Sequence, residues 1–219
     1  GLSIYIEAYN KMILFDTGPD PTILEENSEI LNVDLSLLDC VIISHIHSDH
    51  IGGIPYVGWV SPSVKAYIPY ASGNAIESYI KKNGLVPYEV LDWYKISNNI
   101  YLSKPFYGPP WEHFLILKTR NGLVVVSGSG HPDMVSVLRE IREYYNDEIY
   151  AFIGSIYLRN APDKIIYKTI DEIIKMVSLI APLHNIGERA KNYIAQKYLK
   201  KLVKAFAGSI LRFPMEQQG

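Results

Sequence analysis

The sequence has a single cysteine, Cys40, among its 219 residues. One thiol can form neither an intrachain disulfide nor a zinc site built from several thiolates. Neither sign of charge dominates, because 21 Lys and Arg stand against 23 Asp and Glu for a net charge of −2. This balance predicts that the protein has no nucleic-acid partner held mainly through its phosphates.

Long apolar runs and a secretory signal are also lacking. Apolar stretches such as residues 123–126 are far shorter than the roughly 20 residues of a membrane-spanning helix. Residues 1–6 do not show a charged segment followed by an apolar core, the pattern of a secretory signal. We therefore expect a cytoplasmic protein with no membrane partner. Any metal site must use imidazole and carboxylate ligands.

The chain length favours one domain, and no linker, repeat or low-complexity segment divides it, so we predict a single domain over residues 1–219. Three prolines in residues 103–112 predict a loop, and Asn121-Gly122 predicts a hairpin turn. Hydrophobic periodicity predicts early hairpins and later alternation of strands with helices. The predicted strands are 3–8, 11–15, 40–44, 65–69, 86–91, 113–119, 123–127 and 149–153, and the predicted helices include 21–30, 73–82 and one beginning near residue 134.

Three of the six histidines lie within the segment SHIHSDHIGG, residues 44–53. His45 and His47 directly follow a predicted buried strand, and residues two apart on extended chain point the same way. Asp49 and His50 come next, and the two glycines after them are expected to let the backbone turn. Imidazole and carboxylate ligands together suit Zn²⁺, Fe²⁺ or Mn²⁺. The alternative is a polar loop whose histidines are only solvated.

The spacing of these residues matches a His-x-His-x-Asp-His signature, and the chain thereby resembles the metallo-β-lactamase superfamily. Asp16, in Asp-Thr-Gly at the end of a predicted strand, is similar to the aspartate that supports the metal loop in that fold; a simple turn residue is the alternative. The resemblance implies the α/β class, as an αββα four-layer sandwich of two mixed β-sheets flanked by helices. One strand that usually precedes residues 1–3 is not found in this chain.

Two later segments are similar to the subgroup named for dihydropterin ribofuranosyl-aminobenzene phosphate synthase. They are Gly-Ser-Gly-His-Pro at residues 128–132 and Pro-Leu-His-Asn at residues 182–185. The resemblance implies one metal held by His45, His47 and His131, and a second metal held by Asp49, His50 and His184. It implies one or two divalent metals, zinc first, with manganese and iron as the alternatives.

Several positions around this site depart from the family pattern or stay open. Ser129 stands where a bridging aspartate or a cysteine is usual, so the second metal is expected to bind more weakly and a mononuclear site is the alternative. Asp133, four residues on, is another carboxylate that could join the site. His113 could be a ligand or a packed histidine. Tyr157 replaces a histidine of the subgroup.

The leading functional hypothesis is a metal-dependent hydrolase that attacks an ester or phosphodiester bond with metal-bound hydroxide. Asp49 would accept or orient the nucleophile's proton, and Tyr157 would either donate to a developing oxyanion or merely pack. The alternatives are a pterin-linked synthase and a non-catalytic metal-binding descendant. The expected partner is a small-molecule substrate containing phosphate or pterin, and a homo-oligomer is compatible with the sequence.

Overall fold

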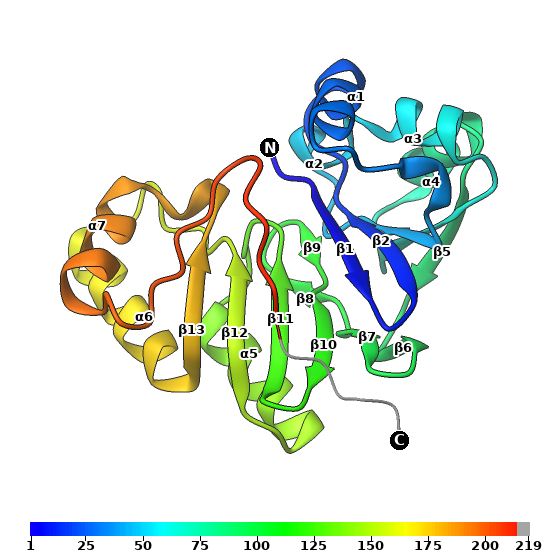
Figure 1. Ribbon diagram of the computed structural model, residues 1–219. Helices are drawn as coiled ribbons and strands as arrows, with labels where there is room; N and C mark the ends of the chain where they lie inside the picture. The colour runs from blue at the N-terminus through cyan, green and yellow to red at the C-terminus, as the bar shows by residue number, and fades with distance from the viewer. Residues whose placement is uncertain (214–219) are drawn as a thin grey trace.

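The computed structural model describes residues 1–213 and contains two large mixed sheets (Figure 1). The first sheet has five strands in sequence order. β1 is antiparallel to β2, and β2 through β5 are all parallel. Its strands are β1 (Ile4–Ala8), β2 (Lys11–Phe15), β3 (Cys40–Ile42), β4 (Lys65–Pro69) and β5 (Val86–Val90).

The second sheet has six strands in the order β13-β12-β11-β10-β7-β6. β11, β12 and β13 run parallel, whereas the pairs β11–β10, β10–β7 and β7–β6 are antiparallel. Its strands are β6 (Tyr94–Ser97), β7 (Ile100–Leu102), β10 (Leu115–Thr119), β11 (Gly122–Ser127), β12 (Ile149–Gly154) and β13 (Val177–Pro182).

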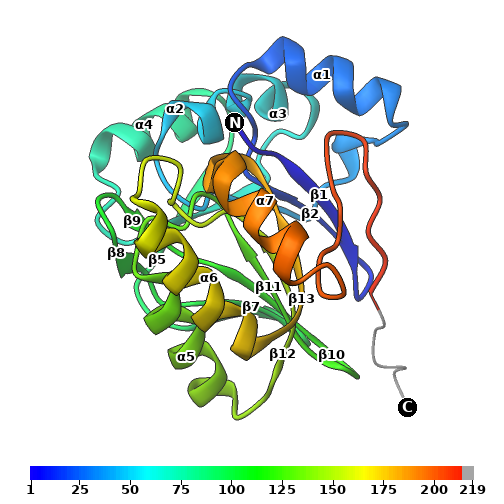
Figure 2. The ribbon, with the colours of Figure 1, turned by 90° about the vertical axis from the view of Figure 1, so that its left-hand side faces the viewer.

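Helices cover the outer face of each sheet, and Figures 1 and 2 show the two helical groups on opposite sides of the molecule. The first sheet carries α1 (Pro21–Ile30), α2 (Ser48–Ile51), α3 (Ile54–Val60) and α4 (Asn74–Lys82), with the short 3-10 helix η1 (Leu35–Leu37) beside them. The second sheet carries α5 (Met134–Tyr145), α6 (Asp163–Met176), η2 (His184–Ile186) and α7 (Glu188–Lys197). No helix within residues 1–213 is both long and apolar enough to cross a membrane.

Alternating side chains on the strands create three apolar layers. Leu14 packs under the helices of the first sheet, whereas its neighbour Phe15 lies between the two sheets. On the second sheet, Val126 lies in the same layer as Phe15, between the two sheets, whereas Val125 faces α5 and α6. Period-two alternation thus gives each sheet two buried faces. The expected order of helices, sheet, sheet and helices is confirmed.

The structure corrects the prediction for residues 103–112. They do not form an open loop: β8 (Phe106–Tyr107) pairs antiparallel with β9 (Trp111–Glu112) around a cis Pro109–Pro110 bond. Both prolines lie in the turn, where no ladder hydrogen bond from their nitrogens is needed, so their density does not prevent the pairing. We call residues 106–112 the aromatic hairpin. Strands β6 and β7, which hydrophobic periodicity does not predict, precede it.

Parallel strands bring the carboxyl ends of β2, β3, β11 and β13 to one edge of the two sheets. The four segments that follow these strands carry Asp16, then His45 to His50, then Ser129 and His131, and finally His184. Side chains far apart in the sequence are therefore collected at one place, as is usual at the carboxyl ends of parallel strands.

Candidate metal centre

His45, His47 and His131 form the first group of possible metal ligands. One ring nitrogen from each lies within 4.8 Å of the others. His45 Nε2 is 3.2 Å from His47 Nδ1, and the His131 ring centre is 4.9 Å from that of His45. His45 is buried, His131 is half-buried and His47 is exposed. The group is therefore anchored in the protein and open to solvent on the His47 side.

Asp49, His50 and His184 form a second group, whose ligand atoms also lie within 4.8 Å of one another. Asp49 Oδ2 is 2.9 Å from His184 Nε2 and 3.7 Å from His50 Nε2. The backbone of His184 is left-handed, with φ of 37°, which is uncommon for a residue other than glycine. The ring centres of His45 and His50 are only 4.1 Å apart, so the two groups adjoin.

Asp16 lies behind both groups and is completely buried. Its Oδ2 is 2.7 Å from His50 Nδ1 and accepts a 2.7 Å hydrogen bond from Ser44 Oγ. Ser44 Oγ is in turn 2.9 Å from His45 Nδ1. One carboxylate thus orients His50 directly and His45 through a hydroxyl, which leaves Nε2 of both rings facing the centre. Asp16, His45 and His50 also have ligand atoms within 4.8 Å of one another, but these hydrogen bonds give Asp16 a supporting position.

Ser129 lies at the second group. Its Oγ is 3.1 Å from His50 Nε2 and accepts a 3.2 Å hydrogen bond from Asn185 Nδ2. The predicted position beside the ligands is therefore occupied by a hydroxyl and an amide. Asp133 belongs to neither group, because it is exposed and caps α5 by accepting from the Val135 N–H.

His113 also lies outside the groups of possible ligands found among residues 1–213. Its ring is wholly buried, burial lowers its pKa to about 3, and neither ring nitrogen makes a hydrogen bond within the described part of the chain. His113 therefore fits the packed alternative. Tyr157 lies at the edge of the site: its ring centre is 4.5 Å from that of His131, and it is 53% exposed.

Glu112 is the supporting residue that sequence reasoning did not identify. It is fully buried at the end of the aromatic hairpin, and Oε1 accepts from the Ser129 and Gly130 N–H groups at 3.0 Å each. Oε2 accepts from the His131 N–H at 2.9 Å. Burial raises the pKa of Glu112, and these three donors oppose that shift. The carboxylate fixes the backbone of the loop that carries His131.

The donor set fits a divalent metal such as zinc, because imidazole and carboxylate donors converge at two adjoining points. His131 Nε2 is buried and makes no hydrogen bond within the described part of the chain. Burial lowers the pKa of His45 and His47, and lowers that of His131 to about 4. All three rings are neutral at pH 7, with lone pairs available for a cation.

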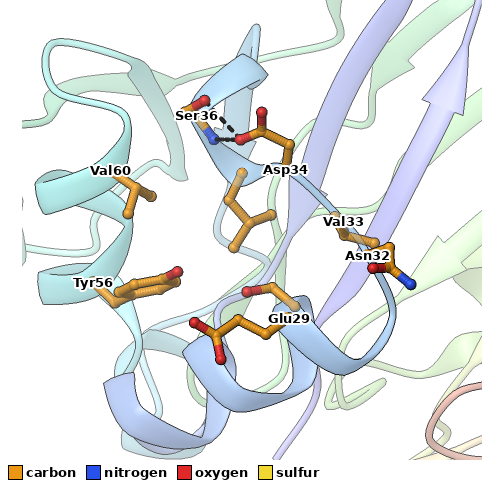
Figure 3. Close-up of a pocket in the computed structure, with 9 residues that line it drawn as sticks. Glu29, Asn32, Val33, Asp34, Ser36, Tyr56 and Val60 are labelled. Atoms are coloured by element: carbon orange, nitrogen blue, oxygen red, sulfur yellow. Dashed lines mark hydrogen bonds between the residues drawn. The ribbon is translucent and has the colours of Figure 1, made fainter.

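A separate pocket of about 460 Å³ lies away from the two ligand groups, among the helices that cover the first sheet, between α1, η1 and α3. Figure 3 shows Tyr56 and Val60 on one side of it and Glu29, Asp34 and Ser36 opposite. The Asp34 carboxylate accepts hydrogen bonds from the Ser36 N–H and hydroxyl, at 2.9 and 2.6 Å. None of the residues that line this pocket belongs to the ligand groups.

Three known proteins show what this chain is similar to. A 7,8-dihydropterin-6-methyl-4-(beta-D-ribofuranosyl)-aminobenzene-5'-phosphate synthase of Methanocaldococcus jannaschii is 27% identical, over 97% of this chain and 90% of its own. The crystal structure of Tm1679, described as a metal-dependent hydrolase of the beta-lactamase superfamily, aligns with a TM-score of 0.80 at 22% identity, covering 95% of this chain and 94% of that one. Human tRNase Z, short form, aligns with a TM-score of 0.70 at 11% identity, covering 98% and 93%.

At such identities the two structures establish likeness of fold alone. Residues 1–141, well over half of the chain, match the family model described as the metallo-beta-lactamase superfamily. That match includes the Asp16 segment, the histidine loop and His131. By this match the chain belongs to the metallo-beta-lactamase superfamily, and the fold agrees with it.

Proposed function

We propose that the protein is a metal-dependent hydrolase that acts on an ester or phosphodiester bond of a small molecule. The observation that carries this proposal is the contact between the two ligand groups, with the His45 and His50 ring centres 4.1 Å apart. Two adjoining cation sites can hold both the attacking and the leaving oxygen of a displacement. The exposure of His47 gives a substrate access to this point.

In this proposal His45, His47 and His131 hold one divalent metal, and Asp49, His50 and His184 hold a second. Zinc is the first choice for this donor set, and manganese and iron are the alternatives. Such metals supply Lewis acidity and lower the pKa of a coordinated water toward about 7. Asp16 and Glu112 keep His50 and the His131 loop in place without contacting the substrate.

Asp49 and Tyr157 are the residues proposed to act on the reacting atoms. Burial raises the pKa of Asp49, but the charges of His50, the Gly1 amino group and His184 together outweigh it, and the net shift is downward. The carboxylate is therefore ionised at neutral pH and can orient the nucleophile or accept its proton at Oδ2. Tyr157 is exposed, with its ring against that of His131, and its hydroxyl is proposed to donate to a negatively charged oxygen.

The second candidate is a pterin-linked synthase. It is favoured by one specific observation, the 27% identity to the M. jannaschii synthase over 97% of this chain. The substrate would then contain pterin and phosphate groups. Tyr157 stands at the site where the resembling subgroup has a histidine, and this difference favours the hydrolase over the subgroup's named reaction.

The deciding experiment combines metal analysis with hydrolysis of bis(4-nitrophenyl) phosphate. The wild-type protein, loaded with Zn²⁺ or Mn²⁺, should retain one to two metals per chain and release 4-nitrophenol. His47→Ala should abolish this activity, because His47 is an exposed ligand whose loss leaves the core intact. Ser48→Ala, an exposed neighbour, is the matched control and should retain activity.

Each outcome separates the candidates. Activity that survives in His47→Ala would mean that the proposed site is not responsible for it. A loaded protein that hydrolyses no ester or phosphodiester but binds a reduced pterin in calorimetry would favour the synthase. A protein that holds metal and shows neither property would fit a non-catalytic descendant.

A further inference from the structure

Beside the first ligand group lies a smaller pocket of about 210 Å³. Its lining comes from three segments: Ile46 between the ligands His45 and His47, Ala71 and Ser72 after β4, and the aromatic hairpin. The hairpin contributes Tyr107 and Trp111, whose ring centres are 5.1 Å apart, with the two prolines of its turn. We propose that this pocket binds an uncharged aromatic ring of the molecule whose scissile bond reaches the metal centre.

The position of the pocket connects it to the metal centre on two sides. Ile46 stands between two ligands of the first group. On the other side, Gly108 of the hairpin lies against the third ligand: a Cβ at Gly108 would be 2.2 Å from Pro132 N and 2.3 Å from the His131 carbonyl carbon. Such close backbone approach requires glycine. The pocket therefore adjoins the segments that carry His45, His47 and His131, through Ile46 on one side and the hairpin on the other.

The hairpin is held firmly enough to form one wall of a binding site. Glu112 at its end accepts hydrogen bonds from three consecutive N–H groups of residues 129–131. Phe106 at its start packs against Phe114, with ring centres 6.0 Å apart. The pocket wall and the His131 loop are thus joined into one unit, so a ring bound against the hairpin has a fixed position relative to the ligands.

The chemistry of the lining selects the occupant. None of the residues that line the pocket carries a charge, so it offers no cationic partner to a phosphate or a carboxylate. Trp111 and Tyr107 contribute two aromatic rings to the lining, and the ring centre of Tyr70, outside the lining, is 6.5 Å from that of Trp111. Aromatic rings pair with other rings by offset stacking or edge-to-face contact. An apolar cavity of about 150 Å³ binds benzene, so about 210 Å³ accommodates one substituted ring.

Tyr107 is 63% exposed, which leaves its ring available to a ligand. Exposed large apolar groups gathered at one place are typical of binding sites. The inference rests on the proposed function, because the ring would belong to the substrate of the metal centre. Its test therefore uses equilibrium binding, which does not require any bond to be broken.

The experiment compares diphenyl phosphate with diethyl phosphate as ligands of the zinc-loaded protein, by calorimetry. The two probes share the same charge and differ in their rings. We expect diphenyl phosphate to bind about tenfold more tightly, because one ring pair and the burial of a ring contribute roughly that factor. Tyr107→Ala and Ile46→Ala should each reduce this preference, whereas Tyr107→Phe, which retains the ring, should keep it.

Trp59→Ala is the control, because Trp59 is 83% exposed and lies outside the pocket. It should leave the preference unchanged, and circular dichroism and metal content should match the wild type in every variant used. Equal binding of the two probes by the wild type, or a preference that persists in both alanine variants, would overturn the inference. If the preference is found but no ester or phosphodiester is hydrolysed, the proposed function fails and the ring pocket stands.

Discussion

The buried Asp16 carboxylate contacts His50 Nδ1 at 2.7 Å, from a strand end 34 residues earlier in the chain. The same oxygen receives the Ser44 hydroxyl, which adjoins His45. Although burial lowers the pKa of His50, the charge and hydrogen bond of Asp16 raise it, so the net shift is upward. One aspartate thus sets the orientation of a ring in each ligand group.

Replacing Asp16 by Asn should weaken metal binding about 10- to 100-fold, the usual effect of removing such a supporting carboxylate. Asn is the informative substitution because Asp16 has φ of 57°, a left-handed conformation that Asn also adopts readily. The backbone is therefore preserved while the charge is lost. Competition with a chromophoric chelator measures the affinity. Unchanged affinity for both metals would show that Asp16 is only a turn residue.

Glu112→Gln should destabilise the protein by about 1–3 kcal/mol, the cost of leaving a buried polar group unsatisfied. The amide has one acceptor oxygen, so its NH₂ group must face at least one of the N–H donors of Ser129, Gly130 and His131. Chemical denaturation measures the change. Glu143→Gln, at an exposed position of α5, is the matched control and should be neutral.

The same variant should also bind the first metal more weakly, because the loop that carries His131 loses its fixed position. A loss of stability with unchanged metal affinity would restrict Glu112 to a structural role. Metal affinity is best compared at temperatures well below the transition of the less stable variant, so that unfolding does not contribute.

The sequence predicts most of the candidate site because its signals are local. His45, His47, Asp49 and His50 lie within six residues after a buried strand, and strand geometry alone indicates that the first two converge. The elements at Lys11–Phe15, Pro21–Ile30 and Lys65–Pro69 also agree with their predicted bounds. Each of these segments carries its own periodicity and end signals.

What the sequence does not predict depends on contacts between distant segments. Glu112 accepts hydrogen bonds from backbone N–H groups of residues 129–131. The identity of the donor residues does not indicate such a contact, because the donor belongs to the backbone. The sequence predicts that Gly52 is needed for a backbone turn, yet its φ is −62°, which any residue adopts. It is required because a Cβ there would lie 2.0 Å from Pro19 O. Only the assembled fold reveals either constraint.

The two ligand groups should release their metals at different pH. Burial lowers the pKa of all three imidazoles of the first group, that of His131 to about 4, so they stay neutral, and able to bind, to a lower pH than a free histidine. In the second group the pKa of His184 is lowered by burial but that of His50 is raised, so protons compete with the metal for His50 at a higher pH. Metal content after dialysis across pH 8 to 4 should therefore fall in two steps. A single loss near pH 6.5 would contradict this assignment.

Tyr157→Phe should lower kcat for a phosphodiester by about 100-fold with little change in KM, if its hydroxyl donates to charge that develops only in the transition state. The variant keeps the ring, whose centre lies 4.5 Å from that of His131, and removes the hydroxyl alone. Steady-state kinetics and metal content should be measured together, because an unchanged metal content excludes an indirect effect through His131. Since Tyr157 is 53% exposed, Phe should leave stability unchanged. Equal kcat in the two proteins would mean that Tyr157 only packs against the ligand.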